Sequence, residues 1–364
     1  MLILTKENKP LLFYSILNLS LILGLLQACA EGKTDGITTI EVPKASDDAF
    51  NLSDLAESVR LVPLETKEGS LLNMIQEVKL FEDRLYVSDM AGQILVFDIE
   101  GNFLYVLGKQ GYGPGEYTHI SSLAVDESAG MIHVASGRKL LTYSIDNKLV
   151  AEGQLPLFID YLDVHQGKLF AVAQLDGIKT ESGYVNQTAL LEISPSLEVV
   201  DSFPLRQVAL KEQTAATYPY KHYISHMGHE RYFYSPVLVN EEILRDTLYR
   251  LDGTTLTPFA KLTFGKSHLD EKNIKTIWIK NIIISKSYVV SEYDSEGDNM
   301  LFLFDKNRSR HFNLKGGILD GEGDPVFLRP LDLANDVFYY ISSAAYSDGM
   351  KEEPNPVIGI VSLK

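Results

Sequence analysis

The chain has 364 residues, of which 45% are hydrophobic and 10% aromatic, so it carries enough apolar material for a sizeable packed core. Its formal net charge is −16. This charge argues against a nucleic-acid partner, whose phosphates attract basic proteins, and an anionic membrane surface would repel the folded domain. Cys29 is the only cysteine, so no disulfide can form within the chain.

The N-terminal segment has the pattern of a secretory signal. Lys6 and Lys9 precede an apolar run over residues 11–26, and the run ends in small residues. A basic region followed by a short hydrophobic region describes a signal peptide. The run is interrupted by polar residues and glycine, which argues against a permanent membrane span.

The end of this run resembles a lipoprotein signal-peptidase box, which here reads Leu26-Gln27-Ala28-Cys29. The resemblance implies removal of residues 1–28 and diacylation of Cys29. A plain signal peptide or an N-terminal anchor is the alternative. Because the segment after Cys29 is polar and contains glycine, residues 29–44 are expected to be the lipidated cysteine and a tether. Residues 45–364 are then expected to form a single domain.

Six units of similar length fill that domain. Short strands that end in Asp or Ser recur at intervals of about 50 residues. They end at Asp98, Ser144, Ser194, Asp252, Asp305 and Ser362. Another short strand precedes each of them, and no convincing amphipathic helix interrupts the series. The repeat predicts an all-β fold, a six-bladed β-propeller with four-stranded antiparallel blades.

The last blade is predicted to be closed by an N-terminal strand. The sixth unit stops after its third strand, and residues 59–64 form an unassigned strand ahead of the first unit. Pairing of this strand with residues 358–363 would close the ring and remove an exposed edge. Pro63 would then have to lie on the outer, unpaired side of an edge strand.

The most distinctive stretch covers residues 97–117 and reads FDIEGNFLYVLGKQGYGPGEY. Its FD-x-x-G-x-F-L turn and its G-x-x-G-x-GPGEY loop resemble the "6-bladed β-propeller" family of secreted and lipid-anchored proteins from Bacteroidetes, which is related to NHL-type propellers. Residues 316–330 give a looser second match. The resemblance implies a fold and an address in the cell envelope, and no established activity.

The glycine loop at residues 108–117 is interpreted as structural. It lacks the Gly-Lys-Ser/Thr ending of a P-loop and precedes a strand, so no helix N-terminus is available for a phosphate. Glu116 and Tyr117 are expected to pin one blade to the next.

The candidate ligand site lies where loops crowd around one mouth of the central channel. These loops join the fourth strand of one blade to the first of the next, and they are the longest irregular stretches of the chain. Residues near the start of the inner strands are the candidates for channel lining. They are His119, Tyr161, His226, Trp278 and Arg329. Such an aromatic and Arg mixture suits carbohydrate or peptide binding, and it suits ordinary packing too.

Two kinds of side-chain cluster could hold a metal ion. His222, His226 and His229 could bind zinc or nickel. The acidic glycine turns could bind calcium through hard oxygen ligands. Their carboxylates are Asp294, Glu296, Asp298, Asp320, Glu322 and Asp324. Histidines that line a surface and plain anionic turns are the structural alternatives, and no cofactor is expected overall.

The sequence therefore favours a non-enzymatic binding or scaffold lipoprotein. It would be tethered to the outer membrane, on the periplasmic or the exposed side, and present its loop face to a glycan, peptide or protein partner. One alternative is a metal-dependent propeller hydrolase or lyase, although no G-x-S-x-G or H-E-x-x-H motif occurs. Another is a structural subunit of an envelope complex. Fold alone cannot choose among these functions.

Overall fold

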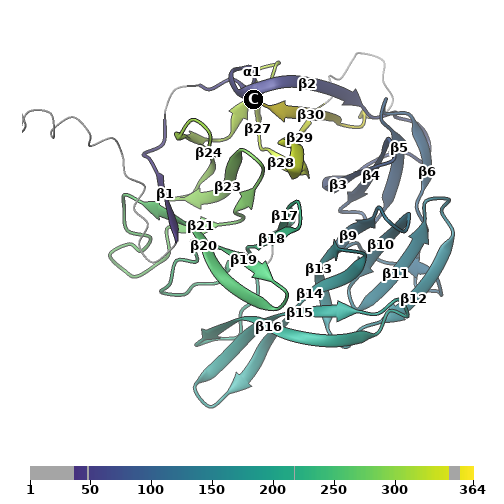
Figure 1. Cartoon of the computed structure of the whole chain (residues 1–364), viewed down its shortest axis with the longest axis horizontal. Helices are drawn as coiled ribbons and strands as arrows, with labels where there is room; N and C mark the ends of the chain where they lie inside the picture. Colours follow the sequence, from purple (N-terminus) through teal and green to yellow (C-terminus); the bar gives the residue numbers. More distant parts are fainter. Residues whose placement is uncertain (1–36, 47–48, 217, 344–352) are drawn as a thin grey trace, which may run out of the picture.

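The computed structural model describes residues 37–46, 49–216, 218–343 and 353–364. The expected signal peptide and Cys29 lie outside the described residues. The described chain is almost entirely β: its helical elements are α1 (Leu52–Leu55) and the short 3-10 helix η1 (Leu333–Asn335). Six sheets surround a central axis, as Figure 1 shows, and this confirms the six-bladed β-propeller.

Each blade is an antiparallel sheet in which the first strand lies near the axis and the fourth at the periphery (Figure 1). The first blade contains β3 (Ile75–Phe81), β4 (Arg84–Asp89), β5 (Ile94–Asp98) and β6 (Phe103–Val106). The second contains β9 (Ser122–Asp126), β10 (Met131–Ser136), β11 (Lys139–Ser144) and β12 (Leu149–Gln154). The third contains β13 (Phe158–His165), β14 (Lys168–Thr180), β15 (Gly183–Ile193) and β16 (Val199–Leu210). The fourth blade contains β17 (Ile224–Met227), β18 (Glu230–Phe233), β19 (Thr247–Asp252) and β20 (Thr255–Phe264).

The fifth and sixth blades depart from simple strand order. In the fifth, the first position is shared by β21 (Ile277–Ile279) and β22 (Ile283–Ile284), which both pair with β23 (Tyr288–Ser295) ahead of β24 (Asp298–Asp305) and β25 (Arg310–Lys315). The sixth contains β28 (Arg329–Asp332), β29 (Val337–Ser342), β30 (Val357–Leu363) and, from the other end of the chain, β2 (Ala56–Pro63). Four two-residue strands form small pairs in loops: β7 (Lys109–Gln110), β8 (Glu116–Tyr117), β26 (Ile318–Leu319) and β27 (Pro325–Val326).

The predicted ring closure is confirmed. Strand β2 pairs antiparallel with β30, with Val59 opposite Val361 and Pro63 opposite Val357. No described strand pairs with the outer side of β2, so the missing N–H of Pro63 disrupts no ladder there. Val62 turns inward and is buried between the first and last blades.

The prediction that the tether extends to residue 44 is wrong. Residues 38–42 form a strand, β1 (Thr38–Val42), which adds in parallel to the outer strand β20 of the fourth blade. The reason is a local alternation in which Ile40 and Val42 are apolar and become buried, while polar residues stand between them. The domain therefore begins at about residue 38 and not at residue 45.

Residues 38–63 form a belt along the outside of three blades; residues 47 and 48 are not described. After β1, Ser46 bridges to Leu314 of the fifth blade. Leu52 and Leu55 of helix α1 then pack into the core between the fifth and sixth blades. The belt reaches the sixth blade as β2, next to the C-terminal strand (Figure 1).

The stretch at residues 97–117 is confirmed as a structural joint. Gly101 has φ +93°, and a Cβ there would stand 2.1 Å from the carbonyl oxygen of Pro63, so the turn needs glycine where it meets the closing strand. Glu116 accepts a hydrogen bond from the N–H of Gly113 at 2.9 Å and pairs with Lys109 at 2.7 Å. Tyr117 is buried and donates its hydroxyl to the carbonyl of Leu107.

Candidate functional site

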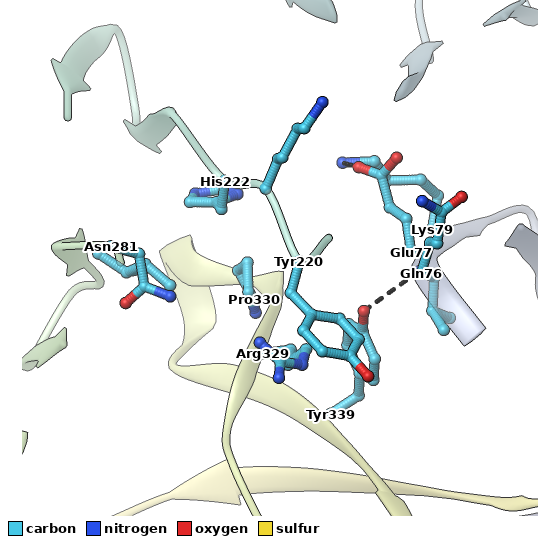
Figure 2. A pocket seen from close by; sticks show the side chains of 12 residues that line it. Gln76, Glu77, Lys79, Tyr220, His222, Asn281, Arg329, Pro330 and Tyr339 are labelled. Carbon is cyan, nitrogen blue, oxygen red and sulfur yellow. Dashed lines mark hydrogen bonds and ion pairs between the residues drawn. The ribbon is translucent and has the colours of Figure 1, made fainter. Parts of the chain in front are cut away.

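A short piece of the β16–β17 connection enters the central channel. We call residues 218–222, which read Tyr-Pro-Tyr-Lys-His, the channel segment. Its side chains contact blades on different sides of the ring: Tyr218 bonds to Glu292 of the fifth blade, and Lys221 pairs with Asp160 of the third. Figure 2 shows Tyr220 and His222 among residues of the first, fifth and sixth blades.

One ionic cluster fixes the start of the segment. Arg329 Nη1 lies 3.2 Å from Glu292 Oε2, and both side chains are nearly buried, at 11% and 9% exposure. The Arg329 guanidinium also lies 3.6 Å from the centroid of the Tyr220 ring. Burial opposes the charge of Arg329, but Glu292 together with Tyr218 and Tyr339 outweighs burial and raises the pKa of Arg329 above its ordinary value. Burial, together with the carboxylate of Glu292, raises the pKa of Tyr218, which keeps its hydroxyl a donor.

The break between β21 and β22 supplies two further groups to this cluster. The backbone N–H of Lys280 and that of Asn281 both donate to the Glu292 carbonyl. Lys280 Nζ then lies 3.7 Å from Glu292 and 2.7 Å from Asp294. The Asn281 side chain accepts from the Glu292 N–H at 2.8 Å. An interrupted inner strand is thus what turns these polar side chains toward the axis.

A second cluster fixes the end of the segment on the third blade. Asp160 accepts from the Tyr223 hydroxyl at 2.6 Å and from the Gln174 amide at 2.9 Å, in addition to its pair with Lys221. The His222 ring stands against Tyr161, with their centroids 6.1 Å apart. Burial, followed by the charge of Lys79, holds the pKa of His222 well below its usual value, so this histidine stays neutral.

The channel segment closes the channel at its centre. The space left between Glu77, Lys79, Tyr220, His222 and Arg329 is only about 20 Å³, close to the room that one water molecule needs. The expected ligand site at the loop-lined mouth is therefore filled by the protein's own side chains.

An open cavity of about 610 Å³ lies at the other mouth of the channel. Its rim is built from the turns that join first and second strands, and not from the long loops that the sequence favoured. The rim residues are Glu127, Ser128, Gln166, Gly167 and Ala334. Cavities of this size accept small ligands or the tip of a larger one.

A histidine–carboxylate pair and a lysine stand in this cavity. His226 Nε2 lies 2.5 Å from Asp163 Oδ1, with His226 36% exposed and Asp163 4% exposed. Arg231 approaches the other oxygen of Asp163 at 3.4 Å. Lys79 pairs with Glu77 at 2.8 Å, and although burial opposes its charge, Glu77 raises the pKa of Lys79. The floor of the cavity thus offers both a cation and a hydrogen-bonding imidazole.

The structure brings three of the five predicted site residues to the channel and leaves two away from it. Tyr161 and His226 line the open cavity, and Arg329 lines the closed centre. His119 is exposed ahead of β9, where Thr118 is its side-chain partner. Trp278 lies in β21 beneath Lys275 and lines neither space, because the inner strand of its blade continues past it to β22.

Sequence reasoning missed the carboxylates and lysines that organise the channel. They are Glu77, Lys79, Asp160, Asp163, Lys221 and Glu292. The available signal was the channel segment itself, because two tyrosines, a proline and two basic groups make a stiff stretch with both aromatic surface to pack and donors to pair. Apart from Lys221, these residues come from three other places in the chain, at 77–79, 160–163 and 292, and no local pattern relates them.

Neither metal hypothesis finds an assembled set of ligands. Within the described ranges, no group of three or more His, Cys, Asp or Glu side chains is placed to hold a metal ion. His222 bonds to Tyr161 and Ser225 while His226 bonds to Asp163, so these histidines face different partners. Asp320 accepts the N–H groups of its own turn. That the protein carries no metal ion stays a prediction, which metal analysis of the purified protein tests.

Comparison with known proteins identifies relatives of the fold. The model of a family described as "Domain of unknown function (DUF4934)" matches residues 37–362. A crystal structure of an inferred exported protein from Bacteroides fragilis is 18% identical with a TM-score of 0.67, covering 90% of this chain and 100% of that one. A gluconolactonase from Xanthomonas campestris is 12% identical with a TM-score of 0.47, covering 89% and 97%. No curated protein sequence matches the chain.

Among the described residues, no helix has the length and apolar character to cross a membrane.

Proposed function

The chain belongs to the DUF4934 family, and from this premise we propose that it is an exported binding protein. In this proposal it holds a polar ligand at the open mouth of its propeller channel. The ligand class is a peptide or glycan segment presented by a partner. The observation that carries the proposal is the cavity of about 610 Å³ in which Tyr161, Asp163, His226 and Lys79 converge. We also propose that this protein is related to NHL-type propellers.

The chemistry of the cavity supports a polar ligand. Lys79 donates, and the Tyr161 ring adds an aromatic wall. The Nε2 of His226 faces the acceptor Asp163, so Nδ1 is the ring nitrogen that remains for a ligand. The surrounding blades are closed and packed, so these groups are preorganised and little ordering is needed on binding. Rigid placement of a few polar groups in a concave site is typical of ligand-binding sites.

The proposal is tested by a screen of glycans and short peptides against the purified protein, read by the shift in melting temperature. A hit should lose roughly ten-fold or more in affinity in His226→Ala, measured by calorimetry, because a charge-assisted or desolvated hydrogen bond is lost. His268→Ala is the matched control, since His268 does not line the cavity and its ring Nε2 bonds to the carbonyl of Glu242 at 2.9 Å. Equal binding by both variants would place the ligand elsewhere.

A second candidate function, a hydrolase or lyase, is favoured by the His226–Asp163 pair. A nearly buried carboxylate that orients a half-exposed imidazole is the arrangement used to activate water or to abstract a proton. Turnover of a screened ligand that depends on His226, or a divalent ion bound in stoichiometric amount, would favour the enzyme. A partner protein that stays bound through purification from membranes would instead favour a structural subunit.

We further propose that Cys29 anchors the protein to the outer membrane through a lipid. Cys29→Ser should move nearly all of the protein from the membrane fraction to the soluble fraction, because the acyl chains supply the membrane affinity. Immunoblots of the separated fractions measure this. An unchanged membrane fraction would contradict lipid anchoring.

A further inference from the structure

A second cavity lies at the periphery, between the third and fourth blades. It encloses about 460 Å³, within the range of small-molecule sites. Its wall is formed by the outer strand β16 and by the segment that joins β18 to β19. Most of the lining is apolar or aromatic: Leu205, Phe233, Tyr234, Ile243, Leu244, Tyr249 and Leu256.

Arg206 stands in this cavity without an acidic partner. Within the described residues, no carboxylate lies within ion-pair distance of its guanidinium, whereas Arg245 and Lys261 each have one. The Arg206 amino groups bond only to neutral acceptors: Thr188 Oγ1 at 3.2 Å, Ser235 Oγ at 3.0 Å, and the Ser235 and Pro236 carbonyls. Its Nε–H is buried and meets no acceptor in the part of the chain that the structure describes.

These neutral contacts fix the position of the guanidinium but leave its charge uncompensated. An unpaired cation that is partly removed from water is costly, and this desolvation lowers the pKa of Arg206. An external anion would remove that cost.

The surroundings add to the excess of positive charge. Arg245 binds Glu241 through two hydrogen bonds, at 2.9 and 2.8 Å, and Lys275 Nζ shares the same carboxylate at 3.7 Å. Lys261 pairs with Asp246 at 3.6 Å. Four cations, counting Arg206, therefore face three carboxylates in a chain whose net charge is −16: Glu241, Asp246 and Asp176, which acts on Arg206 from beyond ion-pair distance. A local cationic site in so acidic a protein is unusual for packing and expected for anion recognition.

We propose that this cavity binds a small organic carboxylate whose apolar body packs on the aromatic and aliphatic wall and whose carboxylate compensates the charge of Arg206. The site is independent of the channel and of the function proposed for it. A hydrogen bond between a charged guanidinium and a carboxylate is stronger than one between neutral groups, so a carboxylate is the ligand group that this site favours.

The test is calorimetric titration of the purified full-length protein at low salt with phenylacetate, with phenylacetamide as the neutral isostere and sulfate as an anion without an apolar body. Phenylacetate should bind saturably and at least about ten-fold more tightly than either comparison ligand, as a charge-assisted hydrogen bond and apolar burial predict. Equal binding of the amide, or sulfate binding as strong as that of phenylacetate, would overturn the proposal.

Two variants separate ligand recognition from folding. Arg206→Gln should abolish phenylacetate binding, whereas Arg60→Gln, an exposed arginine paired with Glu100, should leave it unchanged. Because Arg206 also holds the Ser235 segment, Ile243→Glu provides a variant at a side chain that is 57% exposed. It should weaken binding about ten-fold by repulsion at the rim, and Ile243→Lys should not. Equal affinity of these two variants would contradict a site that recognises charge.

Discussion

Removal of residues 30–64 should abolish the cooperative unfolding transition of the domain. The deletion removes β1 and β2, which complete the outer edges of the fourth and sixth blades. Among its described residues, six large apolar side chains are buried in addition to Ala56: Ile40, Val42, Leu52, Leu55, Val62 and Leu64. Each contributes roughly 1.5–3 kcal/mol by burial, so together they rival the roughly 5–15 kcal/mol by which a typical domain is stable.

The effect is measured by urea unfolding followed by circular dichroism. Deletion of residues 30–36 alone is the matched control, because it shortens the segment ahead of β1 without touching the belt. Leu55→Ala should give an intermediate loss of about 2–5 kcal/mol, since it opens a cavity between the fifth and sixth blades. A deletion of residues 30–64 as stable as the control would mean that the ring closes without its N-terminal strand.

Arg329→Met should lower the free energy of unfolding by about 3 kcal/mol. The substitution leaves the carboxylate of Glu292 nearly buried, with Lys280 at 3.7 Å as its remaining cation, and it removes the stacking on Tyr220. Breaking one side of a buried ion pair costs roughly 3–5 kcal/mol, and Lys280 keeps the cost at the lower end of that range. Urea unfolding at neutral pH is the measurement.

A double variant tells an internal ion pair from a ligand contact. Arg329→Met combined with Glu292→Leu should recover most of the loss, because no buried charge is then left unpaired. Arg329→Lys should lose less than Arg329→Met, since it keeps the charge but not the planar stacking surface. If Arg329 instead served an external ligand, Arg329→Met would leave stability within about 0.5 kcal/mol of the parent protein.

The architecture could be predicted from the sequence because local residue patterns determine it. Alternating apolar strands that end in Asp or Ser, repeated at about 50-residue intervals, define one blade after another. The unfinished sixth unit and the spare strand at residues 59–64 predict their own pairing, which the register of β2 with β30 confirms. Gly101 and the glycine loop were identifiable because tight turns demand positive φ.

The contents of the channel could not be predicted in the same way, because they depend on which distant residues the closed ring brings together. Glu292 meets Arg329 and Tyr218, and Asp163 meets His226, across dozens of residues of sequence. Propeller closure alone decides these pairings, and the entry of the channel segment decides which mouth stays open. Residues 38–42 show the same limit. Their alternation covers only five residues, so the sequence predicts a tether, and they form a strand because the edge of a blade is available to pair with them. The sequence therefore determined the blades and their number, since these rest on short-range periodicity. The site was decided by the tertiary structure, since its charges are compensated only by long-range contacts.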